Sequence, residues 1–411
     1  MSRVFVLVLD SLGLGGAPDA HRFGDEGSNT LLHIAQACAA GQADGAQRRG
    51  PLRLTQLSAL GLSRALALAC DQGLPGDDTV PRAAWAAANE LSRGKDTPSG
   101  HWEMMGVPVE EDWGYFSPGA DGRCFPPALL QAAGRPLGIG GWLGDCHTSG
   151  TEIIARLGQR HVETGWPIVY TSADSVVQIA CHESAFGLQR LYQLCESMRR
   201  EVDALRIGRV IARPFAGSGP DGFQRTARRR DYAMPPPAPT LLERIEAAGG
   251  HTIAVGKVAD IFAHRGIGTA VPAYGHEALM QATLAQVREA PDGSLTMCNF
   301  VDFDQLFGHR RDLAGYAQAL EHFDALLPEL LSTLQPDDLL LISADHGCDP
   351  SWPGSDHTRE RVPLLAWGHR VQAGSHGVRD SFADLGQTAA NWLGLPPLPH
   401  GQALALGRAP A

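Results

Sequence analysis

The stretch Leu339-Leu340-Leu341-Ile342, followed by Ser343-Ala344-Asp345-His346-Gly347-Cys348-Asp349, decides the fold class. Its four leading apolar residues are typical of a strand that is buried on both faces of a parallel sheet. Open α/β folds bind their ligands at the carboxyl edge of such a sheet, which is where Asp345 and His346 follow. Asp345 offers a carboxylate oxygen and His346 an imidazole nitrogen, a mixture that suits Zn²⁺ or Mn²⁺. The sequence therefore predicts an α/β fold with a metal site at this edge.

Two further apolar runs end in the same way. The run from Arg3 to Leu9 leads directly into Asp10, and the run from Leu295 to Val301 leads into Asp302 and Asp304. A single aspartate at such a place is more often a cap of the next element than a metal ligand. Three strand ends that carry Asp favour a shared site. Asp302 and Asp304 compete for the ligand role in the third segment.

Two more histidines extend this pattern. His309 follows Asp304 closely enough for one loop to direct both side chains at a single ion. His357 lies eleven positions after His346, beyond Gly354, where the chain can turn back toward the same edge. We therefore expect a centre with two metal ions, of the kind that usually performs phosphoryl transfer or hydrolysis.

Such a centre needs a nucleophile, and candidates lie in the segment Gly94-Lys95-Asp96-Thr97-Pro98-Ser99-Gly100-His101-Trp102-Glu103-Met104-Met105-Gly106. Coordination to a metal activates a threonine hydroxyl by lowering its pKa. Thr97 is one candidate and Ser99 is its rival, and either residue could instead cap the helix that Pro98 favours. Spacing alone does not separate the two.

The composition is that of a globular intracellular enzyme. The 411 residues are 44% hydrophobic, enough for one large and one smaller domain. The net charge of -11 argues against partners such as nucleic acid or membrane surfaces. The eight cysteines form no CxxC pair, and the sequence shows no signal-peptide pattern and no apolar run long enough to span a bilayer, so we expect a cytoplasmic protein with reduced thiols. The oligomeric state is left open, with a monomer as one alternative.

The order of elements along the chain predicts an insertion. Strand and helix patterns alternate in the first hundred residues and again after about residue 240, which is typical of a doubly wound, mostly parallel sheet. The segment Met234-Pro235-Pro236-Pro237-Ala238-Pro239 marks a boundary, because consecutive prolines fit neither a helix nor a central strand. We expect core segments at 1–103 and 237–411, with an α+β cap domain at 104–236 for substrate recognition. The alanine-rich segment Ala83–Ala88 is interpreted as helix or loop.

The expected cap contains a basic cluster in an otherwise acidic chain. Its members are Arg209, Arg213, Arg225, Arg228, Arg229 and Arg230. Guanidinium groups bind phosphate through paired donors, so Arg209 or Arg213 is expected to hold a substrate phosphate, with Asp174 on a sugar hydroxyl. A solvated basic face is the preferred interpretation of 228–230. Lys257, at the end of the apolar run from Thr252 to Gly256, is a further candidate ligand of the same anion.

Taken together, these motifs resemble those of the phosphopentomutase family, part of the alkaline phosphatase superfamily. The resemblance rests on VLDSLGLGGAPD, GKDTPSGHWEMMG, YTSADSVVQIACHE, RVIARPFAG, RTARRRDYA, NFVDFDQLFGHRRD and SADHGCDPSWPGSDHTRERVPLL, and it spans essentially the whole chain. It implies a core of alkaline phosphatase type.

The resemblance also implies a role for individual residues. Asp10, Asp345 and His346 match the ligands of one metal, and Asp304, His309 and His357 match those of the other. Thr97 matches the threonine that carries the phosphoryl group. Family members commonly have a second threonine where this chain has Ser99, a departure that argues mildly against Ser99 as the nucleophile.

The implied activity is the interconversion of ribose 1-phosphate and ribose 5-phosphate, and of the 2-deoxyribose equivalents. The resemblance implies two divalent metal ions, with Mn²⁺ preferred, and a sugar bisphosphate as primer and intermediate. The residue types alone leave Zn²⁺ open, because both ions accept Asp and His. The expected partners are therefore small sugar phosphates. Another phosphatase of the superfamily, or a phosphoglycerate mutase, is the nearest alternative, and a metal-binding protein without catalytic activity is a more distant one.

Overall fold

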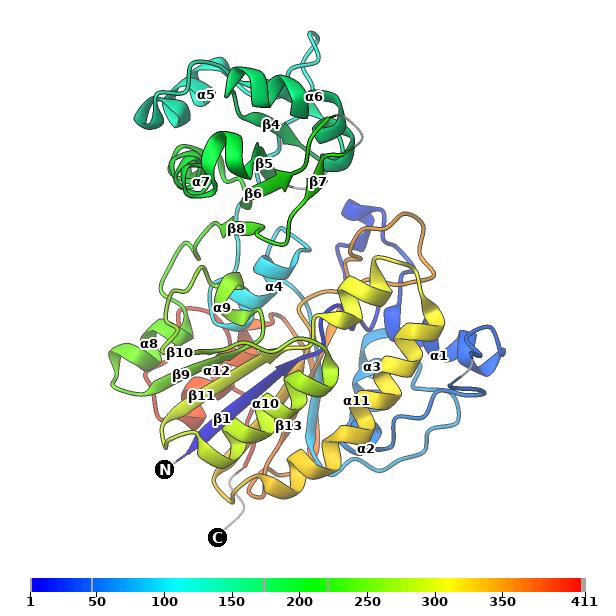
Figure 1. The fold of residues 1–411 in the computed structure, drawn as a ribbon. Helices are drawn as coiled ribbons and strands as arrows, with labels where there is room; N and C mark the ends of the chain where they lie inside the picture. The colour runs from blue at the N-terminus through cyan, green and yellow to red at the C-terminus, as the bar shows by residue number, and fades with distance from the viewer. Residues whose placement is uncertain (1, 46, 173–174, 220–221, 408–411) are drawn as a thin grey trace. The chain divides into compact units, whose positions relative to one another are not determined.

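The computed structural model describes residues 2–45, 47–172, 175–219 and 222–407 (Figure 1). The chain forms two compact units: Met1–Glu111 with Pro236–Ala411, and Asp112–Pro235. The second unit is therefore one continuous segment inserted into the first. Within the first unit, the chain before the insertion and the chain after it are linked, because the backbone N–H of Leu241 donates to the carbonyl of Met105 at 2.8 Å. The expected core segments 1–103 and 237–411 both lie in the first unit, and the assignment of functions to the domains stays a prediction.

The first unit is built on an eight-stranded sheet with the order β10-β9-β11-β1-β12-β13-β2-β14. Its neighbours pair in parallel, except that β13 runs antiparallel to both β12 and β2. This confirms the mostly parallel sheet expected from the sequence. The strands are β1 (Arg3–Val8), β2 (Ala84–Ala88), β9 (His251–Val255), β10 (Thr269–Val271), β11 (Ser294–Asn299), β12 (Asp338–Ser343), β13 (Val362–Trp367) and β14 (Gly374–Arg379).

Strand β1 lies in the middle of this sheet, between β11 and β12. All six of its residues are buried, as are all six of each neighbour, which is why apolar residues predominate in these strands. The one charged side chain in β1, Arg3, forms an ion pair with Asp338, the first residue of β12, with N–O distances of 2.6 and 2.9 Å. The carboxyl ends of these three parallel strands lie together at the opposite edge of the sheet.

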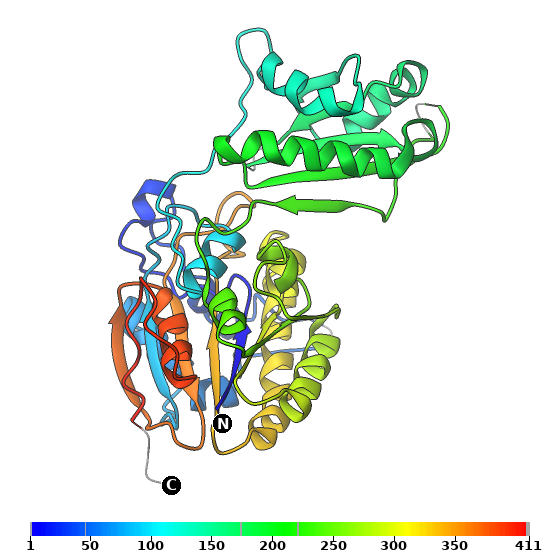
Figure 2. The same ribbon diagram turned by 90° about the vertical axis from the view of Figure 1, so that its left-hand side faces the viewer.

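Helices cover both faces of the sheet. Figure 2 shows α10 and α11 on one face and α12 on the other, the arrangement of a doubly wound fold. Among the described residues, no helix combines the length and apolar character that a membrane crossing requires. The helices and helical turns of this unit are η1 (Ala20–Phe23), α1 (Thr30–Ala39), α2 (Thr55–Ala59), α3 (Leu62–Cys70), α4 (Thr97–Met104), α8 (Leu241–Ala247), α9 (Val258–Ile261), α10 (His276–Glu289), η5 (Phe303–Gly308), α11 (Leu313–Thr333) and α12 (Ala383–Trp392).

One element of the first unit contradicts the sequence analysis. Ala84–Ala88, expected as helix or loop, forms strand β2. Alanine favours helices, but here the segment is buried between β13 and β14, and its pairing with both outweighs that preference.

The second unit is an α+β domain with a mixed sheet of its own. Its strand order is β3-β4-β5-β6-β7, and β8 also pairs with β6. Helices α5 and α7 pack on one side through an apolar cluster, and α6 packs on the other. The elements are α5 (Pro127–Gly134), η2 (Arg135–Leu137), β3 (Leu143–His147), α6 (Gly150–Thr164), β4 (Ile168–Thr171), β5 (Val176–His182), η3 (Glu183–Gly187), α7 (Leu188–Val202), η4 (Asp203–Leu205), β6 (Arg209–Ala216), β7 (Gln224–Arg225) and β8 (Arg230–Ala233).

Candidate metal centre

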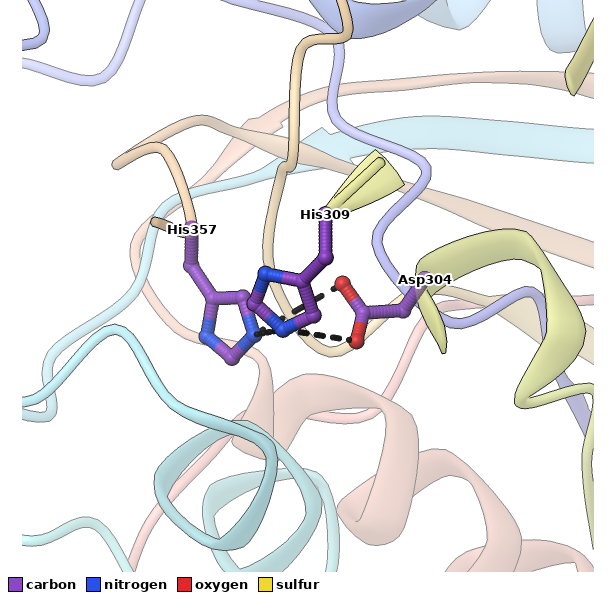
Figure 3. A group of neighbouring side chains, drawn as sticks. All are labelled: Asp304, His309 and His357. Carbon is purple, nitrogen blue, oxygen red and sulfur yellow. Dashed lines mark hydrogen bonds and ion pairs between the residues drawn. The ribbon is translucent and has the colours of Figure 1, made fainter. Parts of the chain in front are cut away.

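Three side chains of the first unit converge near the carboxyl edge of the sheet (Figure 3). One potential ligand atom of each of Asp304, His309 and His357 lies within 4.8 Å of the others. His309 Nε2 is 3.2 Å from one carboxylate oxygen of Asp304, and His357 Nε2 is 3.6 Å from the other. Two imidazole nitrogens and a carboxylate at such distances can hold one divalent cation.

Backbone carbonyl groups orient both of these imidazoles. His309 Nδ1 lies 2.6 Å from the carbonyl oxygen of Ser355, and His357 Nδ1 lies 2.9 Å from that of Lys95. When Nδ1 donates a proton to a carbonyl, Nε2 is left with its lone pair, and this is the arrangement that metal-binding histidines commonly adopt. Both Nε2 atoms point at Asp304 and lie 3.2 Å from each other.

A second group adjoins the first. Ligand atoms of Asp10, Asp304 and His346 also lie within 4.8 Å of one another, so Asp304 is common to both groups. Asp10 and His346 follow the ends of the adjacent strands β1 and β12, and their nearest atoms are 3.6 Å apart. The rings of His346 and His357 stack with centroids 3.8 Å apart. The arrangement can therefore hold two neighbouring cations.

Asp345 lies beside the second group. Its Oδ2 atom is 3.3 Å from His346 Nε2 and 3.2 Å from His101 Nδ1, while Oδ1 accepts a hydrogen bond from the backbone N–H of Ser11 at 3.1 Å. The structure thus brings all six expected ligands into one region. The division into one set with Asp345 and another with Asp304 stays a prediction, because Asp304 completes either group.

The electrostatics of the first group depend on the shared carboxylate. Burial raises the pKa of Asp304, but His357 and His309 outweigh burial, and the pKa lies well below its ordinary value. The hydrogen bond to Asp304 raises the pKa of His309 to about 9. For His357, burial lowers the pKa, yet the charge of Asp304 prevails and brings it to about 9. In the absence of a cation, both imidazoles are therefore doubly protonated and positively charged at neutral pH.

The second group has the opposite character. Burial, with the charges of Asp345 and Asp304, raises the pKa of Asp10 well above its ordinary value. Burial also lowers the pKa of His346 to about 4, so this imidazole is neutral at physiological pH. Carboxylates placed this close repel each other unless a positive charge lies between them.

Buried oxygen atoms without hydrogen-bond partners show that a cation fits here. Asp10 Oδ1, Asp304 Oδ1 and Asp345 Oδ2 are all buried and accept no hydrogen bond. Buried polar atoms are almost always satisfied, so three orphaned carboxylate oxygens in one place call for a missing partner. Carboxylate oxygens combined with neutral imidazole nitrogens are ligands suited to Mn²⁺ or Zn²⁺.

The two candidate nucleophiles have different environments. Thr97 is the first residue of α4, and its Oγ1 lies 3.2 Å from His346 Nε2. Ser99 is fully buried, and its hydroxyl donates to Asp96 at 2.9 Å. Thr97 therefore adjoins the ligand atoms, while the Ser99 hydroxyl is engaged in capping the helix.

Two further candidates lie near these groups. Asp302 belongs to neither ligand group of the described residues, and its carboxylate accepts from the backbone N–H of His276. Lys257 is exposed, and its Nζ donates to Gln305 at 3.2 Å. Burial dominates the pKa of Asp10, but the charge of Lys257 acts against it, which places this ammonium close to the centre.

The candidates in the second unit are only partly described. Asp174 lies outside the described residues. Arg209, at the start of β6, is 4.0 Å from Asp231, and Arg213 on the same strand donates to Gln178 at 3.0 Å. The cluster at 228–230 is already engaged within the unit: two of its arginines pair with acidic side chains and the third lies over an aromatic ring.

Sequence reasoning missed two residues that hold the ligands in place. Asn299, the last residue of β11, donates to Asp10 Oδ2 at 2.7 Å. Ser11 adopts a positive φ of 69° and directs its N–H at Asp345. A polar residue that ends an apolar strand next to β1 was a usable signal for Asn299. The conformation of Ser11 leaves no mark on the sequence.

Comparison with known proteins agrees with this geometry. Residues 2–397 match the model of the Metalloenzyme superfamily. A phosphopentomutase of Sinorhizobium medicae is 56% identical over 408 residues, covering 98% of this chain and 100% of that protein. Phosphopentomutases of Shewanella pealeana and Hahella chejuensis are 55% and 54% identical, each across 98% of this chain and 99% and 98% of their own lengths.

Identity at this level, over nearly the full length of each relative, shows the family. The chain therefore belongs to the phosphopentomutase family, within the Metalloenzyme superfamily.

Proposed function

We propose that this chain interconverts ribose 1-phosphate and ribose 5-phosphate, and the corresponding 2-deoxyribose phosphates. The observation that carries this proposal is the position of the Thr97 hydroxyl, 3.2 Å from His346 within a site that has ligands for two cations. The full-length relatives named phosphopentomutase support the choice of substrate.

The residues assigned to the metals are the six that converge in the first unit: Asp10, Asp304, His309, Asp345, His346 and His357. We propose that they hold two Mn²⁺ ions. When bound, such ions lower the pKa of a nearby hydroxyl and neutralise charge on a transferred phosphoryl group. The orphaned carboxylate oxygens support the presence of cations, and the mixture of oxygen and nitrogen donors is compatible with Mn²⁺.

Thr97 is proposed to carry the phosphoryl group between two positions of the sugar. Phosphorylated Thr97 gives its phosphoryl group to the free hydroxyl of a pentose monophosphate. The bond from phosphorus to Thr97 Oγ1 breaks, a bond to the sugar oxygen forms, and the proton of the sugar hydroxyl ends on Thr97 Oγ1. The resulting bisphosphate turns in the site and returns its other phosphoryl group to Thr97. A sugar bisphosphate primes unmodified Thr97 in the same way.

The second unit is proposed to be a cap that recognises substrate, with Arg209 and Arg213 on the phosphate that does not react and Asp174 on a sugar hydroxyl. Lys257 of the first unit is the other proposed phosphate ligand. A bisphosphate intermediate requires such contacts, because it must stay bound while its two phosphate groups exchange places beside Thr97. Arginine suits this role because its planar donors match phosphate oxygens.

We propose the cytoplasm as the site of action. All eight cysteines are free thiols, and six of them are buried. Reduced thiols of this kind are typical of proteins in a reducing compartment.

The test is a reaction followed by phosphorus NMR. The purified protein, loaded with Mn²⁺ and primed with a sugar bisphosphate, is incubated with ribose 5-phosphate, and ribose 1-phosphate is expected to appear without matching release of inorganic phosphate. Release of phosphate alone would identify a phosphatase instead. A parallel incubation with 3-phosphoglycerate tests the phosphoglycerate mutase alternative, and no 2-phosphoglycerate is expected.

A further inference from the structure

Glu360 is a buried carboxylate that belongs to neither ligand group of the described residues, yet all of its hydrogen bonds lead toward them. Its side chain is almost fully buried, at 1% exposure. Oε2 accepts from the backbone N–H groups of Gly15 at 2.8 Å and Thr30 at 2.9 Å. Oε1 accepts from the hydroxyls of Thr30 at 2.7 Å and Thr358 at 2.6 Å. A buried carboxyl group that accepts four short hydrogen bonds holds its partners firmly in place.

The partners of this carboxylate come from the segments that carry the ligands. Gly15 lies on the loop that follows Asp10, and Thr358 directly follows His357. Both threonine hydroxyls also accept hydrogen bonds from the segment after His346, and that of Thr358 accepts from the backbone N–H of Asp349 at 3.1 Å. Thr30 Oγ1 accepts from the backbone N–H of Cys348 at 3.1 Å, just beyond His346.

Two glycines leave room for this carboxylate. A Cβ atom added at Gly13 or at Gly347 would overlap the carboxylate oxygens of Glu360. Gly347 directly follows His346, and it also pairs with Thr358 through two backbone hydrogen bonds of 2.8 and 3.1 Å. The backbone after Asp10 and the backbone after His346 are thus packed directly against one side chain, which is the close approach that requires glycine.

We propose that Glu360 is a positioning residue that fixes the segments carrying Asp10, His346 and His357 in the geometry needed to bind metal. It lies behind the ligands and does not touch the reacting atoms. This inference rests on the proposed metal centre and adds a group that the ligand assignment does not contain. Groups that orient metal ligands typically change metal affinity by about 10- to 100-fold when they are altered.

The experiment compares Glu360→Gln with Asp324→Asn. Asp324 is a matched control, because it is also a buried carboxylate that accepts hydrogen bonds from backbone N–H groups. Its partners are Gln56 at 3.1 Å and Leu57 at 2.7 Å, in the first turn of helix α2 and not in a ligand segment. For the wild type and both variants, Mn²⁺ alone is titrated into the metal-free protein by calorimetry, and the thermal unfolding midpoint is measured.

We expect both variants to lower the unfolding midpoint of the metal-free protein, whereas only Glu360→Gln weakens Mn²⁺ binding, by about 10-fold or more. Equal Mn²⁺ affinity in Glu360→Gln and the wild type would overturn the inference alone. Equal weakening in both variants would overturn it too, because the effect would then be one of general stability. If the wild type itself bound no Mn²⁺, the proposed metal centre would fail and this inference with it.

If Glu360→Gln does not fold, a milder pair of variants tests the positioning role of Glu360. Thr358→Val removes one hydroxyl that donates to Glu360, and Thr388→Val removes a buried hydroxyl of helix α12 that donates to the carbonyl of Asp384 at 2.6 Å. Weaker Mn²⁺ binding in Thr358→Val, but not in Thr388→Val, supports the positioning role. Unchanged binding in both overturns it.

Discussion

Two hydroxyl groups that lie two residues apart in α4 have different surroundings, and this difference can be tested directly. Thr97→Ala should lower mutase activity by at least about a thousandfold and abolish protein-bound phosphate, because it removes the proposed acceptor oxygen. Ser99→Ala should keep substantial activity, since it removes only a hydroxyl that donates to Asp96. Intact-mass spectrometry and metal analysis of both variants provide the measurement. Phosphate found on Ser99 in the wild type would contradict the assignment.

The two histidines beside Asp304 predict how metal binding depends on pH. Asp304 holds the pKa of His309 and His357 at about 9 in the metal-free protein, so a cation must displace their protons. Mn²⁺ affinity should therefore rise as the pH increases from 6.5 toward 9. Calorimetry at pH 7 in two buffers of different ionisation enthalpy should show proton release. Binding without proton release would contradict this picture.

The same shifts have a consequence for the stability of the metal-free protein, with the sign fixed by linkage. The folded pKa values of these histidines lie above the ordinary value of 6.5, so their contribution is fully present below pH 6.5 and is lost as the pH rises through about 9. The metal-free protein should lose stability over this interval. Bound metal should reverse the trend, because its affinity grows over the same interval.

At the scale of single elements, η5 explains how Asp304 and His309 come together. It is a π-helical turn, and the backbone N–H of His309 donates to the carbonyl of Asp304 at 3.0 Å, five residues back. In an α-helix, residues five apart lie on different faces, whereas the wider π-helical turn brings them to one side. The sequence predicted the pair but assigned it to a loop. It also left Asp302 and Asp304 as competitors, since nothing in the residue types distinguishes them.

Helix α4 depends on its N-cap for the position of its first residue, Thr97. The carboxylate of Asp96 accepts from the backbone N–H of Ser99 at 3.2 Å and from its hydroxyl at 2.9 Å. Asp96→Ala should lower the free energy of unfolding by about 1 kcal/mol, and Asp96→Asn should lower it less, because asparagine also caps helices well. Urea unfolding monitored by circular dichroism measures both. Equal stability of the two variants would argue against the cap.

At the scale of the whole molecule, the apolar runs of the sequence were enough to predict the doubly wound sheet. They identified β1, β11 and β12 because strands buried on both faces need apolar residues throughout. They could not reveal the antiparallel direction of β13, because an apolar run has no direction. The sequence also assigned β2 to the wrong type of structure, because its alanines favour a helix and only pairing with the neighbouring strands makes it a strand. The convergence of Asp10, Asp345 and His346 was predictable from strand ends, whereas the role proposed for Glu360 was not, since its partners meet only in the folded chain.

We propose that the second of the two units recognises substrate, and its arginines test that proposal. Arg213→Ala should lower kcat/KM for ribose 5-phosphate by about 10- to 100-fold, equivalent to about 1.5 to 3 kcal/mol, through the loss of a charge-assisted contact with phosphate. Arg209→Ala should act in the same direction. The slow hydrolysis of phosphothreonine by water should be spared.

Arg160→Ala, at an exposed position of α6 in the same unit, is the matched control and should leave kcat/KM unchanged. Steady-state kinetics on all three variants give the comparison. If neither Arg209→Ala nor Arg213→Ala changes the rate, the non-reacting phosphate is held by other groups, of which Lys257 is the first to test.

The central position of β1 also determines the order in which the molecule can form during synthesis. Both partners of this first strand, β11 and β12, come from the last third of the chain. At about 5 to 20 residues per second, roughly 15 to 70 seconds pass between the synthesis of β1 and that of β12. The inserted unit is one continuous segment, so it can fold on the ribosome during that interval. The apolar first strand has no partner strand until β11 and β12 are made, and exposed apolar segments of this kind are prone to aggregate.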